Sequence, residues 1–352
     1  EINVKLLTLF QSVNMKSYER AIAFVCVIVL ISTSSTDAFS FQQHRGITTA
    51  VTKSNSLFPQ PRNNRLYAST TSVDERDSLK KKIKAEGGKL AFNCKYGALN
   101  PYAIYYGVTA ILLGLPWFLE LMLTNLLYII TRGKVDSFKR LPVFFSQMWG
   151  VLLMFFSQSF PKIIGKEKLN EFYKQDRSAM FVANHNSWMD IPFVGYTIGW
   201  RNYKFISKAE LGKVPILGRS IKTGGHLMID RSDRRSQIRT IKAGMQWLKD
   251  GVHLVTFPEG TRSKTGRLLP FKSGAFKMAH KTGSPVIPCS IINAAEAHPH
   301  HWMFPCKPSK NLCKIIIHDP IESIGKTEQE LATEVRNTII SGLPEEQKPL
   351  LE

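Results

Sequence analysis

The composition of this chain excludes a disordered protein and a protein built on disulfides. Of its 352 residues, 43% are hydrophobic, which is enough for a sizeable core, and its five cysteines are odd in number and form no Cys-x-x-Cys pair. A formal net charge of +20, from 47 Lys and Arg against 27 Asp and Glu, indicates an anionic partner such as nucleic acid, a membrane surface or a phosphorylated substrate. We therefore expect a folded protein that works in a reducing compartment.

Two targeting segments are predicted ahead of the folded part. After Met15, basic residues precede an apolar run at 21–31 and small residues up to Ala38, which is the layout of a signal peptide; residues 1–14 are interpreted as translated upstream sequence. Residues 39–72 hold ten Ser or Thr, four Lys or Arg and no acidic residue, which is typical of a transit peptide. The segments 1–38 and 39–73 together resemble the bipartite presequence of algae with complex plastids. A plastid membrane is therefore predicted; the alternatives are the endoplasmic reticulum membrane, or secretion with a disordered linker.

Two apolar stretches follow a charged segment at 74–89, which is interpreted as a solvated linker or short helix. Residues 101–130 are long enough to span a bilayer but are interrupted by Glu120 and Asn125, whereas residues 141–156 fall short of the roughly 20 residues that a span requires. Aromatic residues cluster at the ends of both stretches, as at a membrane interface. We predict a membrane-associated helical hairpin within 74–160, which either dips into one leaflet or spans the bilayer once or twice. The alternative is a pair of buried core helices.

From residue 161 the pattern changes to short β-branched runs that alternate with helical spacing. Helices are expected at 191–200, 236–249 and 328–340, and strands at 179–183, 203–207, 253–257, 285–291 and 314–318. Strands that alternate with helices predict an α/β layer architecture for a domain over residues 161–352.

The first motif with chemical potential is Asn-His-Asn-Ser-Trp-Met-Asp at 184–190. A histidine can act as a base when an acceptor holds its other ring nitrogen, and Asp190 could provide that acceptor for His185. A spacing of five residues does not suit one face of a helix, so the pair should meet only if His185 lies in the turn before a helix. Ser187 and Asp190 match a capping pattern that would start a helix there. The alternative is a capped helix with an incidental exposed histidine.

The second motif is Phe-Pro-Glu-Gly-Thr-Arg-Ser at 257–263, which leaves a predicted strand and enters a loop. Gly260 permits a tight backbone path, Arg262 offers the two-pronged donor that suits phosphate, and Thr261 adds a hydroxyl donor. The third motif, at 225–231, is an apolar strand that delivers Arg231, and the fourth, at 284–288, is a strand framed by prolines with no catalytic role expected. The second, third and fourth motifs fall in or beside a basic region, 201–280, with 17 Lys and Arg against five Asp and Glu. Such a region would concentrate anionic substrates and lipids.

The order and spacing of the four motifs resemble the glycerolipid acyltransferase family, and most of all the plastid type of 1-acylglycerol-3-phosphate acyltransferase. The likeness extends over about residues 140–325, and one departure is Leu227-Met228, where the family usually has a Phe before the Arg. The resemblance implies a mixed sheet flanked by helices, preceded by a helical hairpin that grips the membrane. It also implies the transfer of an acyl chain to the sn-2 hydroxyl of lysophosphatidate, with His185 as general base, Asp190 fixing its tautomer and no acyl-enzyme.

The resemblance further implies how the substrates are held. Arg262, helped by Lys208 and Arg231, would bind the acceptor phosphate, and Glu259 would position the glycerol part. The acyl donor would be a thioester of acyl carrier protein or of coenzyme A, and no other cofactor is expected. The predicted substrate-binding residues are Lys208, Arg231, Glu259, Gly260, Thr261 and Arg262.

Other classes of protein fit the sequence less well. A nucleic-acid binder is disfavoured because no recognised motif accompanies the basic charge, and the segment 212–220 departs from a phosphate-binding P-loop. A metal site is a minor alternative, since the histidines and cysteines at 298–313 match no standard zinc spacing. No Gly-x-Ser-x-Gly elbow is present. Within the family, the acceptor could also be another lysophospholipid or glycerol 3-phosphate, and an inactive membrane scaffold is the alternative that is not an enzyme.

Overall fold

The computed structural model describes residues 67–214 and 217–350, with side chains from residue 77 onward. The chain divides into two compact units, Glu1–Gly97 and Ala98–Glu352. The described part of the first unit contains helix α4 (Tyr67–Gly87) and strand β1 (Phe92–Cys94). The charged segment at 74–89 is therefore largely helical, and the helix is longer than predicted. The predicted upstream residues and signal peptide (1–38) and most of the transit-like segment (39–73) lie outside the described residues, and residues 67–73 belong to α4.

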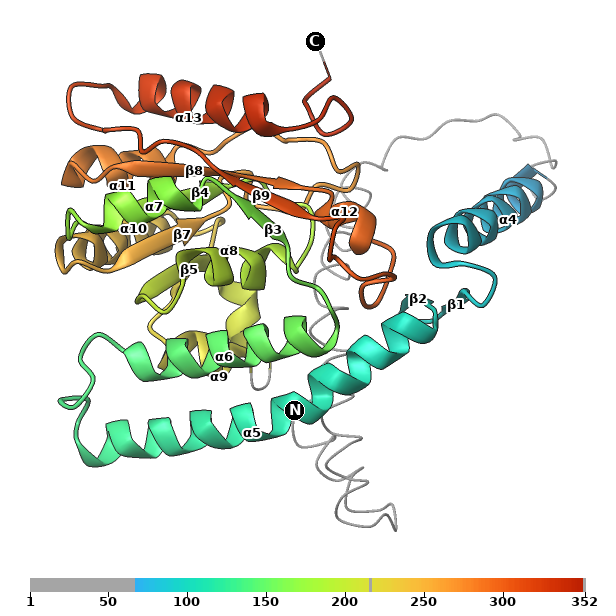
Figure 1. Cartoon of the computed structure of the whole chain (residues 1–352), viewed down its shortest axis with the longest axis horizontal. Coiled ribbons are helices and arrows are strands. Elements are labelled where there is room, and N and C mark those ends of the chain that lie inside the picture. The colour runs from blue at the N-terminus through green and yellow to red at the C-terminus, as the bar shows by residue number, and fades with distance from the viewer. Residues whose placement is uncertain (1–66, 215–216, 351–352) are drawn as a thin grey trace, which may run out of the picture. The chain divides into compact units, whose positions relative to one another are not determined.

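The second unit is built on a seven-stranded sheet with the order β3-β9-β8-β4-β7-β5-β6 (Figure 1). The strands from β8 to β6 run parallel to one another, whereas β9 runs antiparallel to β8 and pairs in parallel with β3. The prediction of a mixed sheet is thus confirmed. The strands are β3 (Lys162–Ile164), β4 (Met180–Ala183), β5 (Tyr203–Lys208), β6 (Leu227–Ile229), β7 (His253–Thr256), β8 (Val286–Ile292) and β9 (Lys314–Ile317).

The central strands are apolar on both faces because helices cover the sheet on two sides. All residues of β4 and β7 are buried, which is the pattern expected of parallel strands inside an α/β layer. In Figure 1, α13 and α6 lie on opposite sides of the sheet. One core layer lies between the sheet, at β4 and β7, and three helices that cover it. These helices are α10 (Arg234–Lys249), α11 (Gly274–Thr282) and α13 (Glu328–Gly342).

The two apolar stretches form the helices α5 (Pro101–Ile130) and α6 (Arg140–Phe156), which pack against each other through stacked Trp117 and Trp149, 5.0 Å between ring centroids. Helix α6 is tied to the sheet unit, because Gln147 Nε2 donates hydrogen bonds to the carbonyls of Gly195 (3.2 Å) and Gly199 (2.6 Å) around the end of α8 (Asp190–Ile198). Among the described residues, α5 is the one helix that is long and apolar enough to cross a membrane.

A buried lysine anchors the turn between α5 and α6. The Lys204 ammonium on β5 donates hydrogen bonds to the carbonyl of Lys139 (2.9 Å) and to Asn202 Oδ1 (3.0 Å). Burial lowers the pKa of Lys204 to about 7; the charge of Asp136 opposes this shift, and those of Lys139 and Arg140 add to it. The turn is therefore attached to the sheet through an uncommon buried amine.

Several short elements were not predicted from the sequence, because each has too few residues for a clear period. They are four short helices and one short strand. Their bounds are β2 (Gly97–Leu99), α7 (Lys166–Tyr173), the 3₁₀ helix η1 (Ala209–Lys213), α9 (Leu217–Thr223) and α12 (Ala294–Ala297).

Candidate active site

The predicted site residues come from the carboxyl ends of adjacent parallel strands. His185 follows β4, the 257–263 loop follows β7, Lys208 ends β5, and Arg231 follows β6. Neighbouring parallel strands end at the same edge of a sheet, and ligands of open α/β sheets bind at that edge. The topology therefore gathers residues that lie up to 77 positions apart in the sequence, from His185 to Arg262.

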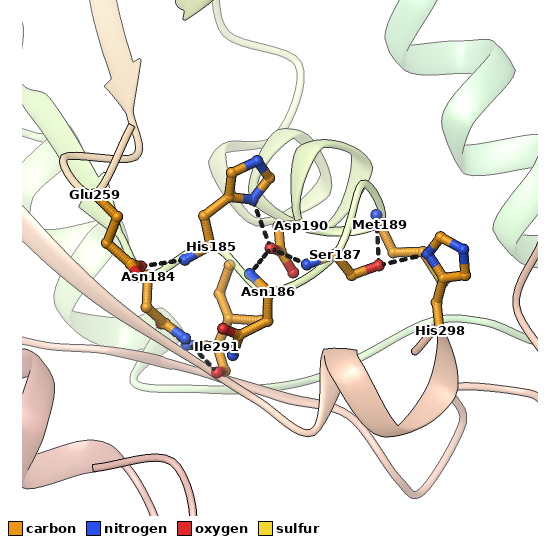
Figure 2. A network of polar contacts seen from close by, with 9 residues as sticks. All are labelled: Asn184, His185, Asn186, Ser187, Met189, Asp190, Glu259, Ile291 and His298. Atoms are coloured by element: carbon orange, nitrogen blue, oxygen red, sulfur yellow. Dashed lines mark hydrogen bonds and ion pairs between the residues drawn. The ribbon is translucent and has the colours of Figure 1, made fainter. Parts of the chain in front are cut away.

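His185 and Asp190 meet as the spacing predicted, with the histidine in the turn before a helix. His185 Nδ1 lies 2.8 Å from Asp190 Oδ2, and Asp190 is the first residue of α8 (Figure 2). The same carboxylate oxygen accepts the backbone N–H groups of Asn186 (2.7 Å) and Ser187 (2.8 Å). Because Oδ2 faces three N–H donors, it holds Nδ1 of His185 in the protonated form, and Nε2 is the ring nitrogen left to take a proton.

The predicted cap is formed in part. Asp190 accepts the N–H of Ser187, as in a capping box, but the Ser187 hydroxyl accepts the N–H of Met189 (3.1 Å) and the regular helix begins only at Asp190. The capping pair therefore closes a tight turn ahead of the helix. This turn brings two side chains together whose spacing would place them apart on a regular helix.

The surroundings of the pair differ sharply between the two residues. Asp190 is fully buried, whereas 15% of the His185 side chain remains accessible. The imidazole stacks on Phe257, with 4.1 Å between ring centroids and 15° between planes. This packing restricts the ring to one orientation, and it was not foreseen from the sequence.

Glu259 is a buried brace between two loops. Its Oε1 accepts the N–H of His185 (2.6 Å), and its Oε2 accepts the N–H of Leu269 (2.9 Å). Burial raises the pKa of Glu259 to about 8, against the two N–H donors, which lower it. Both carboxylate oxygens are thus engaged with backbone, and the predicted contact with the glycerol part of a substrate stays a prediction.

The 257–263 loop also grips His185 from its other side. Ser263 N–H donates to the carbonyl of His185 (2.8 Å), so the backbone of the histidine is bonded at both its N–H and its C=O. Gly260 has φ of +75°, and a Cβ there would lie 2.9 Å from Nη2 of Arg231. The positive φ therefore favours glycine, and a Cβ at this position would displace the guanidinium that packs on it.

A group of cations surrounds this loop. Burial lowers the pKa of Lys208, the charge of Arg231 lowers it further, Glu210 opposes the shift, and Arg262 and Lys272 add smaller contributions. Lys208 is therefore close enough to Arg231, Arg262 and Lys272 for their charges to repel its ammonium, and the charge of Glu210 partly offsets them. Such an arrangement favours the binding of a multiply charged anion. Lys272 was not among the predicted site residues, and Thr261 is exposed on the same loop.

Asn184 was given no role from the sequence, although it ties the motif to the sheet. Its side chain donates to the carbonyl of Ile291 (2.8 Å) and accepts the N–H of Ile291 (2.7 Å) on the neighbouring β8 (Figure 2). The one available signal was a polar residue directly after a buried strand. The proline-framed strand thus supports the site from the side without supplying a reacting group.

The histidines and cysteines at 298–313 do not gather into a metal site. Within residues 67–214 and 217–350, no group of three or more His, Cys, Asp or Glu is placed to hold an ion. His298 instead makes hydrogen bonds to Ser187 and to the carbonyl of Trp302.

Comparisons with known proteins agree with the motifs. A family model described as Acyltransferase matches residues 161–292. The chain is 32% identical to the 1-acyl-sn-glycerol-3-phosphate acyltransferase of Chlamydomonas reinhardtii over 69% of this chain and 70% of that one. It is 34% identical to a chloroplastic enzyme of the same name from Arabidopsis thaliana, over 57% of this chain and 53% of that one.

A solved structure extends the likeness to the fold. The crystal structure of the 1-acyl-sn-glycerophosphate acyltransferase of Thermotoga maritima superposes with a TM-score of 0.50 at 28% identity, covering 65% of this chain and 93% of that one. The segment that matches the family model includes His185 and Asp190. The chain therefore belongs to the acyltransferase family that includes the 1-acyl-sn-glycerol-3-phosphate acyltransferases.

Proposed function

We propose that this protein transfers an acyl chain from an acyl thioester to the sn-2 hydroxyl of 1-acylglycerol 3-phosphate, giving phosphatidate. One observation carries the proposal: an oriented histidine, 2.8 Å from a fully buried aspartate, is bonded at its backbone to the loop that bears Arg262. A base for a hydroxyl and a site for a phosphate thus share one edge of the sheet.

In the proposed reaction, His185 Nε2 takes the proton of the acceptor hydroxyl as its oxygen attacks the thioester carbonyl. The tetrahedral intermediate collapses, the carbon–sulfur bond breaks, and the imidazolium returns the proton to the leaving thiolate. Asp190 keeps Nδ1 protonated throughout and stabilises the transient imidazolium. The acyl group and the proton are therefore both accounted for, and no other reactant is needed.

A direct attack, without an acyl-enzyme, is supported by the direction of Ser187. Its hydroxyl is buried, bonds to His298 Nδ1 at 3.0 Å and accepts the N–H of Met189. In Figure 2 the side chains of His185 and Ser187 extend to different sides of the loop. The nearby serine is therefore a structural residue and the acceptor hydroxyl is the nucleophile.

The acceptor phosphate is assigned to the cations Lys208, Arg231 and Arg262. Burial is the main cause of the lowered pKa of Lys208, and the charges of Arg231 and Arg262 add to it; a phosphate dianion would offset that repulsion. The same chemistry would accept glycerol 3-phosphate or another lysophospholipid, so the acceptor is decided by assay.

The lipid acceptor is reached from a membrane surface, in our proposal that of a plastid. Only 17% of the apolar window in α5 is buried, and large apolar side chains stand exposed along both helices. Such a continuous exposed face is uncommon on a protein surrounded by water. The chloroplastic relative supports the plastid as the compartment. The exposed residues include Leu112, Leu115, Leu119, Leu123, Leu126 and Ile129 of α5, and Phe144, Leu152 and Phe155 of α6.

The test uses the purified full chain in lipid nanodiscs with lysophosphatidate and an acyl thioester, and it measures phosphatidate. We expect turnover in the native protein, with a loss of about a thousandfold in His185→Ala and none in His280→Ala, a matched change of an exposed histidine. Equal activity in native protein and His185→Ala would disprove the mechanism. A panel of acceptors, each with acyl carrier protein and coenzyme A donors, identifies the substrate pair. No product with any pair would favour the inactive scaffold.

A further inference from the structure

A third support of the catalytic loop comes from outside the four motifs. His298 follows the short helix α12, which comes after β8, and it lies six residues beyond the segment that matches the family model. Strand β8 is parallel to β4, so its carboxyl end reaches the same edge of the sheet as His185. His298 is separated from Ser187 by 111 residues, yet the two side chains are bonded (Figure 2).

The hydrogen bonds of His298 define its tautomer. Nε2 lies 3.0 Å from the carbonyl oxygen of Trp302, which can only accept, so Nε2 carries the proton. In a neutral ring Nδ1 is then an acceptor, and the Ser187 hydroxyl, 3.0 Å away, donates to it. Burial lowers the pKa of His298 to about 3, and the charge of Arg262 lowers it further, so the ring stays neutral and keeps its acceptor.

Ser187 connects this chain of bonds to the base. Its hydroxyl is held by His298 and accepts the N–H of Met189, while its own N–H donates to Asp190 Oδ2. Asp190 Oδ2 also accepts from His185 Nδ1. A rotation of Ser187 would therefore disturb the oxygen that orients the imidazole.

We propose that His298 is a positioning residue of the transfer reaction: through Ser187 it fixes the 184–190 loop and the direction in which Asp190 holds His185. The loop is then tied at three points, to β8 by Asn184, to the 257–263 loop by Glu259, and to the end of α12 by His298. The proposal rests on the proposed function, because a residue can position a base only if the base acts.

Variants can separate positioning from a structural role in the core. His298→Leu removes the acceptor, whereas His298→Asn places an amide oxygen near the position of Nδ1. Ser187→Ala removes the donor. His318→Leu is the matched control, because His318 Nε2 lies 2.8 Å from the buried hydroxyl of Ser290, a second Ser–His bond, and that hydroxyl donates to the carbonyl of Ile339 on α13.

We expect His298→Leu to lower kcat by about ten- to a hundredfold, since a small misplacement of a base is costly, and to leave KM for lysophosphatidate unchanged. His298→Asn should recover most of the lost rate. The double variant Ser187→Ala/His298→Leu should be no slower than the slower single variant, because both changes break one bond. His318→Leu should lower Tm but leave kcat unchanged. A native kcat in His298→Leu, or independent effects in the double variant, would overturn the proposal.

A second readout does not depend on turnover. The proton on Nδ1 of His185 gives a low-field NMR signal when it is bonded to Asp190, and its absence from His185→Ala assigns it. We expect His298→Leu to shift or broaden this signal and His318→Leu to leave it in place. An unchanged signal in His298→Leu would refute the positioning role even if the native protein had no transferase activity, in which case the proposed function would fail separately.

Discussion

Replacing Asp190 with asparagine tests the base most directly, because it removes a charge and keeps the shape. An asparagine can place its carbonyl oxygen where Oδ2 lies and still accept from His185 Nδ1 and from the N–H groups of Asn186 and Ser187. The turn before α8 should therefore survive. What is lost is the attraction between a carboxylate and the imidazolium that forms during the reaction.

The size of that loss follows from the geometry. The bonded atoms of His185 and Asp190 are 2.8 Å apart, which places the charge centres about 4 Å apart, and at an effective dielectric constant of about 20 two unit charges at that distance attract by about 4 kcal/mol. Since about 1.4 kcal/mol corresponds to a tenfold change in rate, we expect kcat to fall by about a thousandfold.

The assay compares kcat, KM and Tm of the native protein with those of Asp190→Asn and Asp190→Ala. Asp190→Asn should lower kcat with little change in KM or Tm. Asp190→Ala should also destabilise the fold, because it leaves the two buried N–H groups of Asn186 and Ser187 without an acceptor at about 1–3 kcal/mol each. If Asp190→Asn kept kcat within a few-fold of the native value, the negative charge of Asp190 would not be stabilising an imidazolium during the reaction.

Three further changes test two residues of the catalytic region and the buried lysine that anchors the turn between α5 and α6. Glu259→Gln leaves only one acceptor for the two N–H groups that Glu259 binds; we expect a loss of about 1–3 kcal/mol in the free energy of unfolding together with a lower kcat, and a denaturant titration that shows no loss would remove the bracing role. Gly260→Ala introduces a Cβ 2.9 Å from the Arg231 guanidinium at a φ of +75°, so KM for lysophosphatidate should rise about tenfold, whereas an unchanged KM would separate Arg231 from phosphate binding. Burial lowers the pKa of Lys204 to about 7 from about 10.4 in the unfolded chain. Between these values the unfolded state binds more protons than the folded state, so stability should rise with pH over this window. The rise of Tm with pH should be smaller in Lys204→Met than in the native protein. An equal rise in both proteins would show that other groups cause it.

The sequence was sufficient for features that a local pattern controls. The apolar runs predicted α5 with the bounds that the structure has, and the buried strands β4 and β7 to within a residue. The meeting of His185 with Asp190 was predicted as well, because a capping pattern announces a turn. These features depend on residues that are close in the chain.

The contacts that hold the site from a distance were not predicted. Asn184 binds Ile291, and Ser187 binds His298, across more than 100 residues each. Neither pair has a spacing rule, because the partner is chosen by the order of the strands and not by the sequence near it. Glu259 illustrates the same limit: its motif marks it as important, but only the fold shows that both of its oxygens bind backbone N–H groups.

Helix α8, nine residues long, connects the His185–Asp190 pair to helix α6. Its first residue, Asp190, orients the base, and the carbonyls of Gly195 and Gly199 around its far end are bonded to Gln147 of α6. A helix of nine residues is about 13 Å long and stiff, so it acts as a spacer of constant length between the apolar surface and the imidazole. In the proposed reaction at a membrane surface, this constant length would set the depth from which the acceptor is drawn: a hydroxyl beside a headgroup phosphate would reach His185, and one buried among acyl chains would not.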